Sequence, residues 1–213
     1  MRVIVFGATG MVGQGVLRES FRDDRIEEVL SIGRNSTGVT HPKLREVIVK
    51  DLFTFTAPNI DFKHYDACLF CLGVSSAGMS EADYTRLTYD LTVGWAQMLA
   101  RENPNMSLVY VSGAGTGGKA MWAQVKARTE NALFALFPSA YMIRLGALRA
   151  LHGERSKTRW TRIAYKFLWP LLPLMGAITT EELARGMIRA AREKTPKRIL
   201  ENRDLRELAT SKS

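Results

Sequence analysis

Two hydrophobic patterns alternate along this chain. Short apolar runs without a regular polar alternation are typical of strands that are covered on both faces of a sheet. Such runs predict strands at residues 3–6, 29–32, 46–49, 67–72, 108–111 and 140–145. Longer runs with apolar residues at helical spacing predict helices at residues 12–21, 82–101 and 119–136. Because helices lie between several of the strands, we expect a doubly wound α/β fold, a parallel sheet with helices on both faces.

The last third of the chain departs from this alternation. Residues 149–178 begin with a basic stretch that contains Trp and continue into the apolar run FLWPLLPLMGAI. We expect this segment to leave the sheet and cover the substrate side of a single domain that spans residues 1–213. A helix follows, with Thr180 as its predicted N-cap and with Glu181 and Glu182 in its first turn. A last edge strand is predicted at residues 197–200.

The composition is that of an ordinary soluble globular protein, with 46% hydrophobic and 24% charged residues. The first residues show no secretory signal pattern, and no apolar run approaches the ~20 residues of a membrane span. The chain contains two cysteines. Together these features predict a reducing, cytoplasmic location.

The net charge of +9 bears on the choice of partners. It suits an anionic ligand such as a phosphorylated cofactor, although a solvated basic surface explains it equally well. The basic residues from Arg149 to Lys166 could bind an anionic substrate. Binding of a membrane surface or of nucleic acid would rest on charge alone and is not expected. The run FLWPLLPLM is interpreted as a substrate wall or a contact in a homodimer.

The stretch VIVFGATGMVGQGVL carries the first chemical signal. Its three glycines lie between a predicted strand and a predicted helix. At this spacing the first permits a tight exit from the strand, the second lets backbone N–H groups approach a pyrophosphate, and the third lets the helix pack closely on the strand. The helix offers its free N–H groups and positive dipole end to the phosphates. The predicted contacts of this dinucleotide site are Gly7, Thr9, Gly10, Met11, Val12 and Gly13.

The ends of the next strands indicate which dinucleotide is bound. NAD-selective sites place an acidic residue after the second strand, where it binds the ribose 2′-hydroxyl. Here that strand ends in SIGRNS, and Arg34 takes the place of the acid. Because a guanidinium can stack on adenine and pair with a 2′-phosphate, NADP(H) is predicted in preference to NAD(H).

Two further loops are expected at the same cofactor. Asp51 and Leu52, after the third strand, are predicted to face the adenine, although Asp51 could equally be an ordinary turn residue. After the fourth strand, Cys71, Leu72 and Gly73 are expected to pass their backbone close to the ribose and nicotinamide half.

Most of the chain carries a further set of recognisable segments: FGATGMVGQGVL, SIGR, CLFCLGVSSAG, VYVSGAGTGG, WAQVKARTE, MIRLGALRALHGERS and RILENRDLREL. Together they resemble the atypical short-chain dehydrogenase/reductase family of NAD(P)-binding, epimerase-like proteins, and within it the Tat-interacting oxidoreductase-like group. The resemblance implies an NADP(H)-binding Rossmann fold. It also implies a Ser–Tyr–Lys catalytic set after the fifth strand and before the sixth.

This catalytic set is only partly present. The serine position matches Ser112 and the lysine position matches Lys126, but the tyrosine position holds Trp122. No tyrosine occurs between residues 111 and 140. In the family the lysine lowers the pKa of the tyrosine, which then exchanges a proton during hydride transfer. An indole donates a hydrogen bond but does not ionise, so Trp122 could orient a carbonyl or stack on it but could not be the acid–base group.

Other candidates are weaker. Cys68 and Cys71 form a C-x-x-C pair, but inside a strand they would point to opposite faces, so redox chemistry is not expected. The three histidines show no ligand spacing, and no metal site is expected. Substitute acid–base groups could be His152, Tyr84 or Tyr89.

Two functions therefore remain open. The chain could be an NADP(H)-dependent oxidoreductase or epimerase that acts on a small molecule through a non-standard site. Alternatively, it could be a regulatory protein that binds NADPH and signals to a protein partner without turnover.

Overall fold

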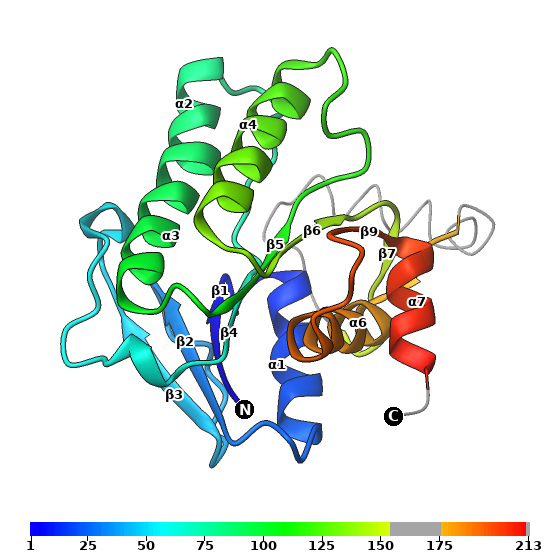
Figure 1. Cartoon of the computed structure of the whole chain (residues 1–213). Coiled ribbons are helices and arrows are strands. Elements are labelled where there is room, and N and C mark those ends of the chain that lie inside the picture. Colours follow the sequence, from blue (N-terminus) through cyan, green and yellow to red (C-terminus); the bar gives the residue numbers. More distant parts are fainter. Residues whose placement is uncertain (154–175, 212–213) are drawn as a thin grey trace.

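The computed structural model describes residues 1–153 and 176–211 (Figure 1). Within them a seven-stranded parallel sheet has the order β3-β2-β1-β4-β5-β6-β9. The strands are β1 (Arg2–Phe6), β2 (Glu28–Gly33), β3 (Leu44–Ile48), β4 (Ala67–Phe70), β5 (Ser107–Val111), β6 (Ala140–Arg144) and β9 (Ile199–Glu201). The chain winds outward from β1 in both directions, so the predicted doubly wound Rossmann-type sheet is confirmed.

Helices cover both faces of the sheet (Figure 1). One face packs against α1 (Met11–Arg22), α6 (Thr180–Glu193) and α7 (Asn202–Thr210). The other packs against α3 (Leu91–Glu102) and α4 (Met121–Leu136). Alternate residues of each strand supply the two cores: Val5 faces α1 and α6, whereas Ile4 and Phe6 face α3. This double burial explains why the strands appear in the sequence as unbroken apolar runs.

Short elements complete the described chain. Two 3₁₀ turns, Leu52–Thr54 and Phe62–His64, follow β3, and the strands β7 (Leu148–Arg149) and β8 (Ile178–Thr179) form a small parallel pair. No helix among the described residues is both long and apolar enough to cross a membrane. Residues 154–175 lie outside the described residues, so the covering role predicted for residues 149–178 stays a prediction.

Several predicted boundaries are wrong by one to a few residues. The strand predicted at 67–72 ends at Phe70, so Cys71 and Leu72 belong to the following loop. The helix predicted at 82–101 is interrupted: α2 (Glu81–Thr85) continues into a π-helical turn, Arg86–Asp90, before α3 begins. The helix predicted from residue 119 begins at Met121, after the extended N-cap Ala120. The last strand lies at Ile199–Glu201 and not at 197–200.

The cap of α6 also differs from the prediction. Thr179, not Thr180, is the N-cap: its hydroxyl accepts from the backbone N–H of Glu182 at 3.1 Å. The Glu182 carboxylate accepts in return from the backbone N–H of Thr179 at 2.9 Å, which completes a capping box. Thr179 holds the extended conformation that a cap needs because it pairs with Arg149 in the β7–β8 ladder.

Candidate cofactor and catalytic site

The predicted site residues gather at one edge of the sheet. Strands β1, β4 and β5 lie side by side and run in the same direction, so the loops that follow them leave from the same edge. These loops are the glycine turn after β1, residues 71–73 after β4 and residues 112–118 after β5. In open parallel sheets this carboxyl edge is where ligands bind.

Two of the three glycines are required by close backbone contacts. Gly7 has a φ of +77°, and a Cβ there would lie 2.7 Å from the backbone nitrogen of Leu72. A Cβ on Gly13 would lie 2.2 Å from the carbonyl oxygen of Gly7. The turn is therefore packed directly against the loop after β4, and no other residue type fits at either position without moving backbone.

Gly10 has a different role. It is the N-cap of α1 in an extended conformation, and no side chain caps this helix. Its own N–H donates to Gly7 at 2.9 Å, and the side-chain amide of Gln14 donates to the carbonyl of Thr9 at 2.9 Å. A Cβ on Gly10 would approach only the Gly7 carbonyl, at 3.3 Å. The helix thus begins with its first N–H groups, those of Met11 and Val12 among them, presented to whatever lies beyond Gly10.

The loops after β2 and β3 meet at the same edge. The N–H of Val49 donates to Gly33 at 2.9 Å, which extends the pairing of the two strands to their ends. Arg34 follows directly; its side chain is exposed and forms no hydrogen bond or ion pair with the rest of the described chain. An unengaged guanidinium at this position is available to an anionic ligand.

Asp51 and Leu52 have structural roles of their own. The Asp51 carboxylate caps a 3₁₀ turn by accepting from the N–H of Phe53 at 3.0 Å. Leu52 is buried, and its carbonyl accepts from the indole of Trp95 at 2.8 Å. The turn interpretation of Asp51 is therefore sufficient to explain it, and contact of either residue with adenine stays a prediction.

Ser112 lies buried at the end of β5 in a directed hydrogen-bond chain. Its hydroxyl is 2.9 Å from that of Thr116, and Thr116 donates its only proton to the carbonyl of Gly113 at 2.7 Å. Thr116 must therefore accept the proton of Ser112. In this arrangement the Ser112 oxygen faces other groups as an acceptor, not as a donor.

Lys126 approaches the same strand end from α4. Its Nζ lies 3.3 Å from the carbonyl oxygen of Val111 and 3.4 Å from the hydroxyl of Tyr110. Burial lowers the pKa of Lys126 to about 8, and the negative charge of Glu130 acts in the opposite direction. The two contacts engage two of the three ammonium protons within the described chain, which leaves the third for a ligand.

Trp122 precedes Lys126 by one helical turn and is therefore on the same face of α4. Its ring packs against the loop after Ser112: ring carbons lie 3.7 Å and 3.5 Å from where Cβ atoms of Gly113 and Gly115 would be. These are ordinary van der Waals distances, so the indole lies close against the loop that follows Ser112.

The sequence interpretation missed Tyr110 and Thr116, the direct partners of Lys126 and Ser112. Tyr110 was detectable, because residues 110 and 112 of a strand point to the same face. Thr116 was not, since its contact with Ser112 depends on the path of an irregular loop.

The remaining candidates fit poorly. Burial raises the pKa of the Cys71 thiol to about 12 and that of Cys68 well above its usual value, so neither is a reactive thiolate. The two cysteines pack against opposite faces of the sheet, as predicted. Tyr84 is buried and its pKa is raised by burial, while exposed His152 lies 3.4 Å from Glu181.

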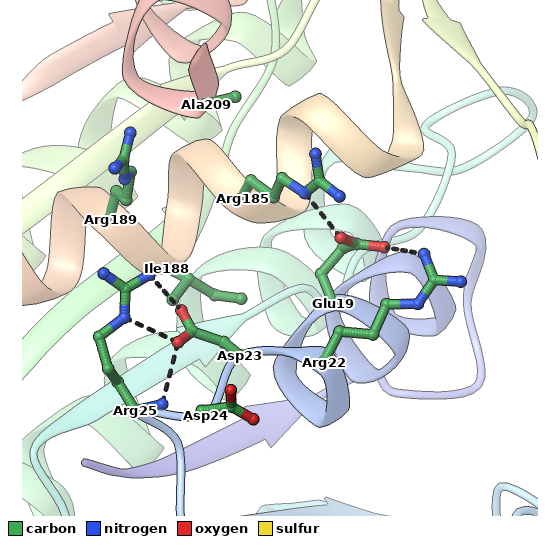
Figure 2. Close-up of a pocket in the computed structure, with 9 residues that line it drawn as sticks. All are labelled: Glu19, Arg22, Asp23, Asp24, Arg25, Arg185, Ile188, Arg189 and Ala209. Carbon is green, nitrogen blue, oxygen red and sulfur yellow. Dashed lines mark hydrogen bonds and ion pairs between the residues drawn. The ribbon is translucent and has the colours of Figure 1, made fainter. Parts of the chain in front are cut away.

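A cleft of about 560 Å³ lies away from this edge, at the C-terminal end of α1 beside α6 and α7 (Figure 2). Several of its charged groups bind one another: Arg25 and Asp23 are 2.8 Å apart, and Arg185 and Glu19 are 2.8 Å apart. Glu19 is buried, so the second pair ties α1 to α6. We interpret this cleft as part of the helix packing rather than as a ligand site.

The partly buried Lys126 predicts a pH-dependent stability. Between pH 8 and its ordinary pKa of 10.5, Lys126 binds fewer protons in the folded than in the unfolded state, so its unfavourable contribution fades as pH rises through this range. Lys126→Met should therefore raise the free energy of unfolding at pH 7 by about 1–3 kcal/mol. This gain should shrink toward pH 10.5. Urea denaturation at several pH values measures it, with Lys119→Met, at an exposed loop residue, as the control. A variant that is less stable than wild type at every pH would contradict the prediction.

The fold defines the class of this protein: it has a Rossmann-type sheet that is shared with solved NAD-bound enzymes. UDP-glucuronic acid 4-epimerase from Bacillus cereus, in complex with NAD, matches with a TM-score of 0.69 over 94% of this chain and 78% of that chain, at 12% identity. WbmF from Bordetella bronchiseptica, in complex with NAD⁺, matches with a TM-score of 0.71 over 98% and 76%, at 16% identity. At these identities the likeness concerns the fold.

By sequence the chain is similar to three curated fungal proteins, and no family model matches it. "Protein FMP52-1, mitochondrial" of Scheffersomyces stipitis is 26% identical over 98% of both chains. "Protein FMP52, mitochondrial" of Meyerozyma guilliermondii is 26% identical over 91% of this chain and 86% of that protein. The protein of the same name from Chaetomium globosum is 30% identical over 54% and 50%. These comparisons do not support the narrower resemblance to the Tat-interacting group.

The names of these relatives contradict the predicted cytoplasmic location, because all three are called mitochondrial. The prediction used the low cysteine content and the missing secretory pattern. Both features argue against an oxidising, secreted environment, but neither distinguishes the cytoplasm from another reducing compartment.

Proposed function

We propose that this chain is a short-chain-dehydrogenase-like protein that binds NAD(P) and catalyses an oxidoreductase or epimerase reaction on a small molecule. The observation that carries the proposal is the glycine turn. Gly7 and Gly13 admit no Cβ, and the uncapped N-terminus of α1 opens next to Gly10. This backbone fits a pyrophosphate. The NAD bound in the solved neighbours supports the same assignment.

Ser112, Lys126 and Trp122 are the proposed catalytic residues. A bound nicotinamide would supply or accept the hydride. Lys126 is the one of the three that can carry a proton near neutral pH, and its third N–H is available to a substrate oxygen. Ser112 would accept a hydrogen bond from a substrate hydroxyl, since its own proton is bound to Thr116. Trp122 would form an apolar wall beside the substrate.

Equilibrium titration of the full chain with NADPH and NADH tests the cofactor assignment, with tryptophan fluorescence and calorimetry as the readouts. Saturable binding of at least one nucleotide is expected. If neither nucleotide binds to the folded protein, the proposed function is wrong.

The alternative, an NADPH-binding regulator that acts through a protein partner or as a homodimer, is favoured by Trp122, which cannot ionise. It would be supported if NADPH changed the oligomeric state in analytical ultracentrifugation while a panel of carbonyl substrates gave no NADPH oxidation. Turnover of any substrate in the panel would contradict it.

A preference for NADP(H) over NAD(H) is part of the proposal and rests on Arg34. Arg34→Ala should weaken NADPH binding roughly 10- to 100-fold, since a hydrogen bond to a charged group contributes about 1.5–3 kcal/mol. NADH binding should change little, because NADH lacks the 2′-phosphate. Paired titrations of both nucleotides measure the effect. Arg101→Ala, which removes the same charge from an exposed position at the end of α3, is the control. Equal losses for both nucleotides would refute the assignment.

A further inference from the structure

Tyr110 contacts Lys126 in two ways. Its hydroxyl is 3.4 Å from the lysine Nζ, and the same Nζ lies 5.1 Å from the centre of the tyrosine ring. Tyr110 is almost fully buried, at 1% exposure, on the face of β5 that α4 covers. The phenol therefore packs against the inner side of the ammonium group. The ammonium group also donates to the backbone carbonyl of Val111 at 3.3 Å.

The hydrogen bond between the two side chains has a fixed direction. An ammonium group has three protons and no acceptor, so Lys126 donates and the phenol oxygen of Tyr110 accepts. Tyr110 and the carbonyl of Val111 therefore supply two acceptors to the amine, one from a side chain and one from the strand backbone.

Two observations exclude Tyr110 itself as the missing acid. Burial raises its pKa far above the ordinary value, so the phenol stays neutral. It is also closed off from the loop edge where a substrate would bind, as its 1% exposure shows. Its chemistry can reach a substrate only through Lys126.

We propose that Tyr110 is a positioning residue for the catalytic site, which holds the amine of Lys126 at the carboxyl end of β5 and stabilises its charged form against burial. Its relevance to catalysis rests on the proposed function, whereas its hold on Lys126 can be tested without any cofactor.

The other charged groups around Lys126 act in identifiable directions. Glu130 lies one turn further along α4 and favours the ammonium, but its carboxylate is already paired with Arg144 of β6 at 2.7 Å. Tyr84 of α2 faces Tyr110 and is neutral, since burial raises its pKa. Among the described residues, the phenol oxygen of Tyr110 is thus the side-chain acceptor in direct contact with the amine.

The test is the pH dependence of lysine acetylation by trace acetic anhydride, measured for the Lys126 peptide by mass spectrometry in the full chain. Tyr110→Phe keeps the ring and removes the acceptor, so the ammonium is stabilised less and the amine is neutral at lower pH. Labelling of Lys126 at pH 7 should rise about 3- to 10-fold over wild type. About one tenth of an amine with a pKa of about 8 is already neutral at pH 7, which limits the rise to about 10-fold. Tyr141→Phe, at a buried tyrosine on the other face of the sheet, should have no effect.

A second variant keeps the proposal falsifiable if Tyr110→Phe does not fold. Tyr110→Leu removes the hydroxyl together with the ring and keeps an apolar side chain at this buried position. The pH at which Lys126 labelling is half-maximal, the labelling midpoint, should again be lower than in wild type. An unchanged midpoint in a folded variant of either kind would overturn the proposal, as would a move to higher pH.

The same samples separate this inference from the proposed function. If NADPH binds at the site as proposed, it should protect Lys126 from acetylation in wild type. A lowered midpoint in Tyr110→Phe without NADPH binding would support the role of Tyr110 and refute the cofactor assignment. Protection of wild-type Lys126 by NADPH, together with an unchanged labelling midpoint in Tyr110→Phe, would support the cofactor assignment and refute the role of Tyr110.

Discussion

Gly10→Val is expected to fold normally and to lose at least about 100-fold in NADPH affinity, which corresponds to two lost hydrogen bonds to a charged group. The structure separates the effect of this substitution on folding from its effect on NADPH binding. A Cβ on Gly10 would lie 3.3 Å from the nearest non-adjacent backbone atom, the Gly7 carbonyl, so a small shift accommodates it. The added methyl groups would nevertheless occupy the space in front of the first N–H groups of α1, where the pyrophosphate is proposed to bind. Titration by calorimetry and thermal melting of the same sample measure both quantities.

Two comparisons sharpen this experiment. Gly10→Ala should give an intermediate loss, because one methyl group blocks less of the space. Ala120→Val adds similar bulk at the extended N-cap of α4 and should leave the affinity unchanged. Gly13 is unsuitable, since a Cβ there would lie 2.2 Å from backbone and disturb the turn itself. Full NADPH affinity in folded Gly10→Val would show that this turn does not hold the phosphates.

Trp122→Tyr is expected to create or raise carbonyl-reductase activity, because it returns an ionisable phenol to the helix turn before Lys126. Lys126 retains an ammonium proton without a partner in the described chain, and its positive charge would lower the pKa of a tyrosine beside it. General acid–base assistance contributes about 10²- to 10⁴-fold when the geometry is right. Steady-state NADPH oxidation with a panel of simple aldehydes and ketones measures the change.

The controls identify the group responsible. Trp122→Phe leaves an aromatic ring without a hydroxyl and should not gain activity. Trp122→Tyr combined with Lys126→Met should lose most of the gain, because the charge that favours the phenolate is gone. If wild type turns over faster than Trp122→Tyr, the chain already has a working proton donor, and the indole is part of an effective site.

Several features near the start of the chain were predictable because their signals are local in the sequence. The glycine spacing predicted the turn after β1. The contact that requires Gly13 lies within this turn, whereas the contact that requires Gly7 comes from the loop after β4. The unbroken apolar runs predicted the strands, since each is buried on both faces. The place of Arg34 followed from its position directly after β2.

The tertiary structure decided which neighbour each site residue has. Periodicity placed Ser112 and Lys126 near one strand end, but it could not show that Thr116 takes the serine proton or that Tyr110 accepts from the lysine. These contacts join a strand to a loop and to a helix, and they depend on how those elements pack.

The sequence by itself thus determined the fold class, the dinucleotide-like turn and the absence of a tyrosine before Lys126, because each is set by residues close together in the chain. It could not choose between Thr179 and Thr180 as the cap of α6, since both are threonines and the choice follows from the pairing of β7 with β8. Nor could it show that Asp51 caps a turn or that Lys126 packs beside Tyr110. Those outcomes belong to the tertiary structure, because burial and hydrogen-bond direction are set by atoms that only the packed fold brings together.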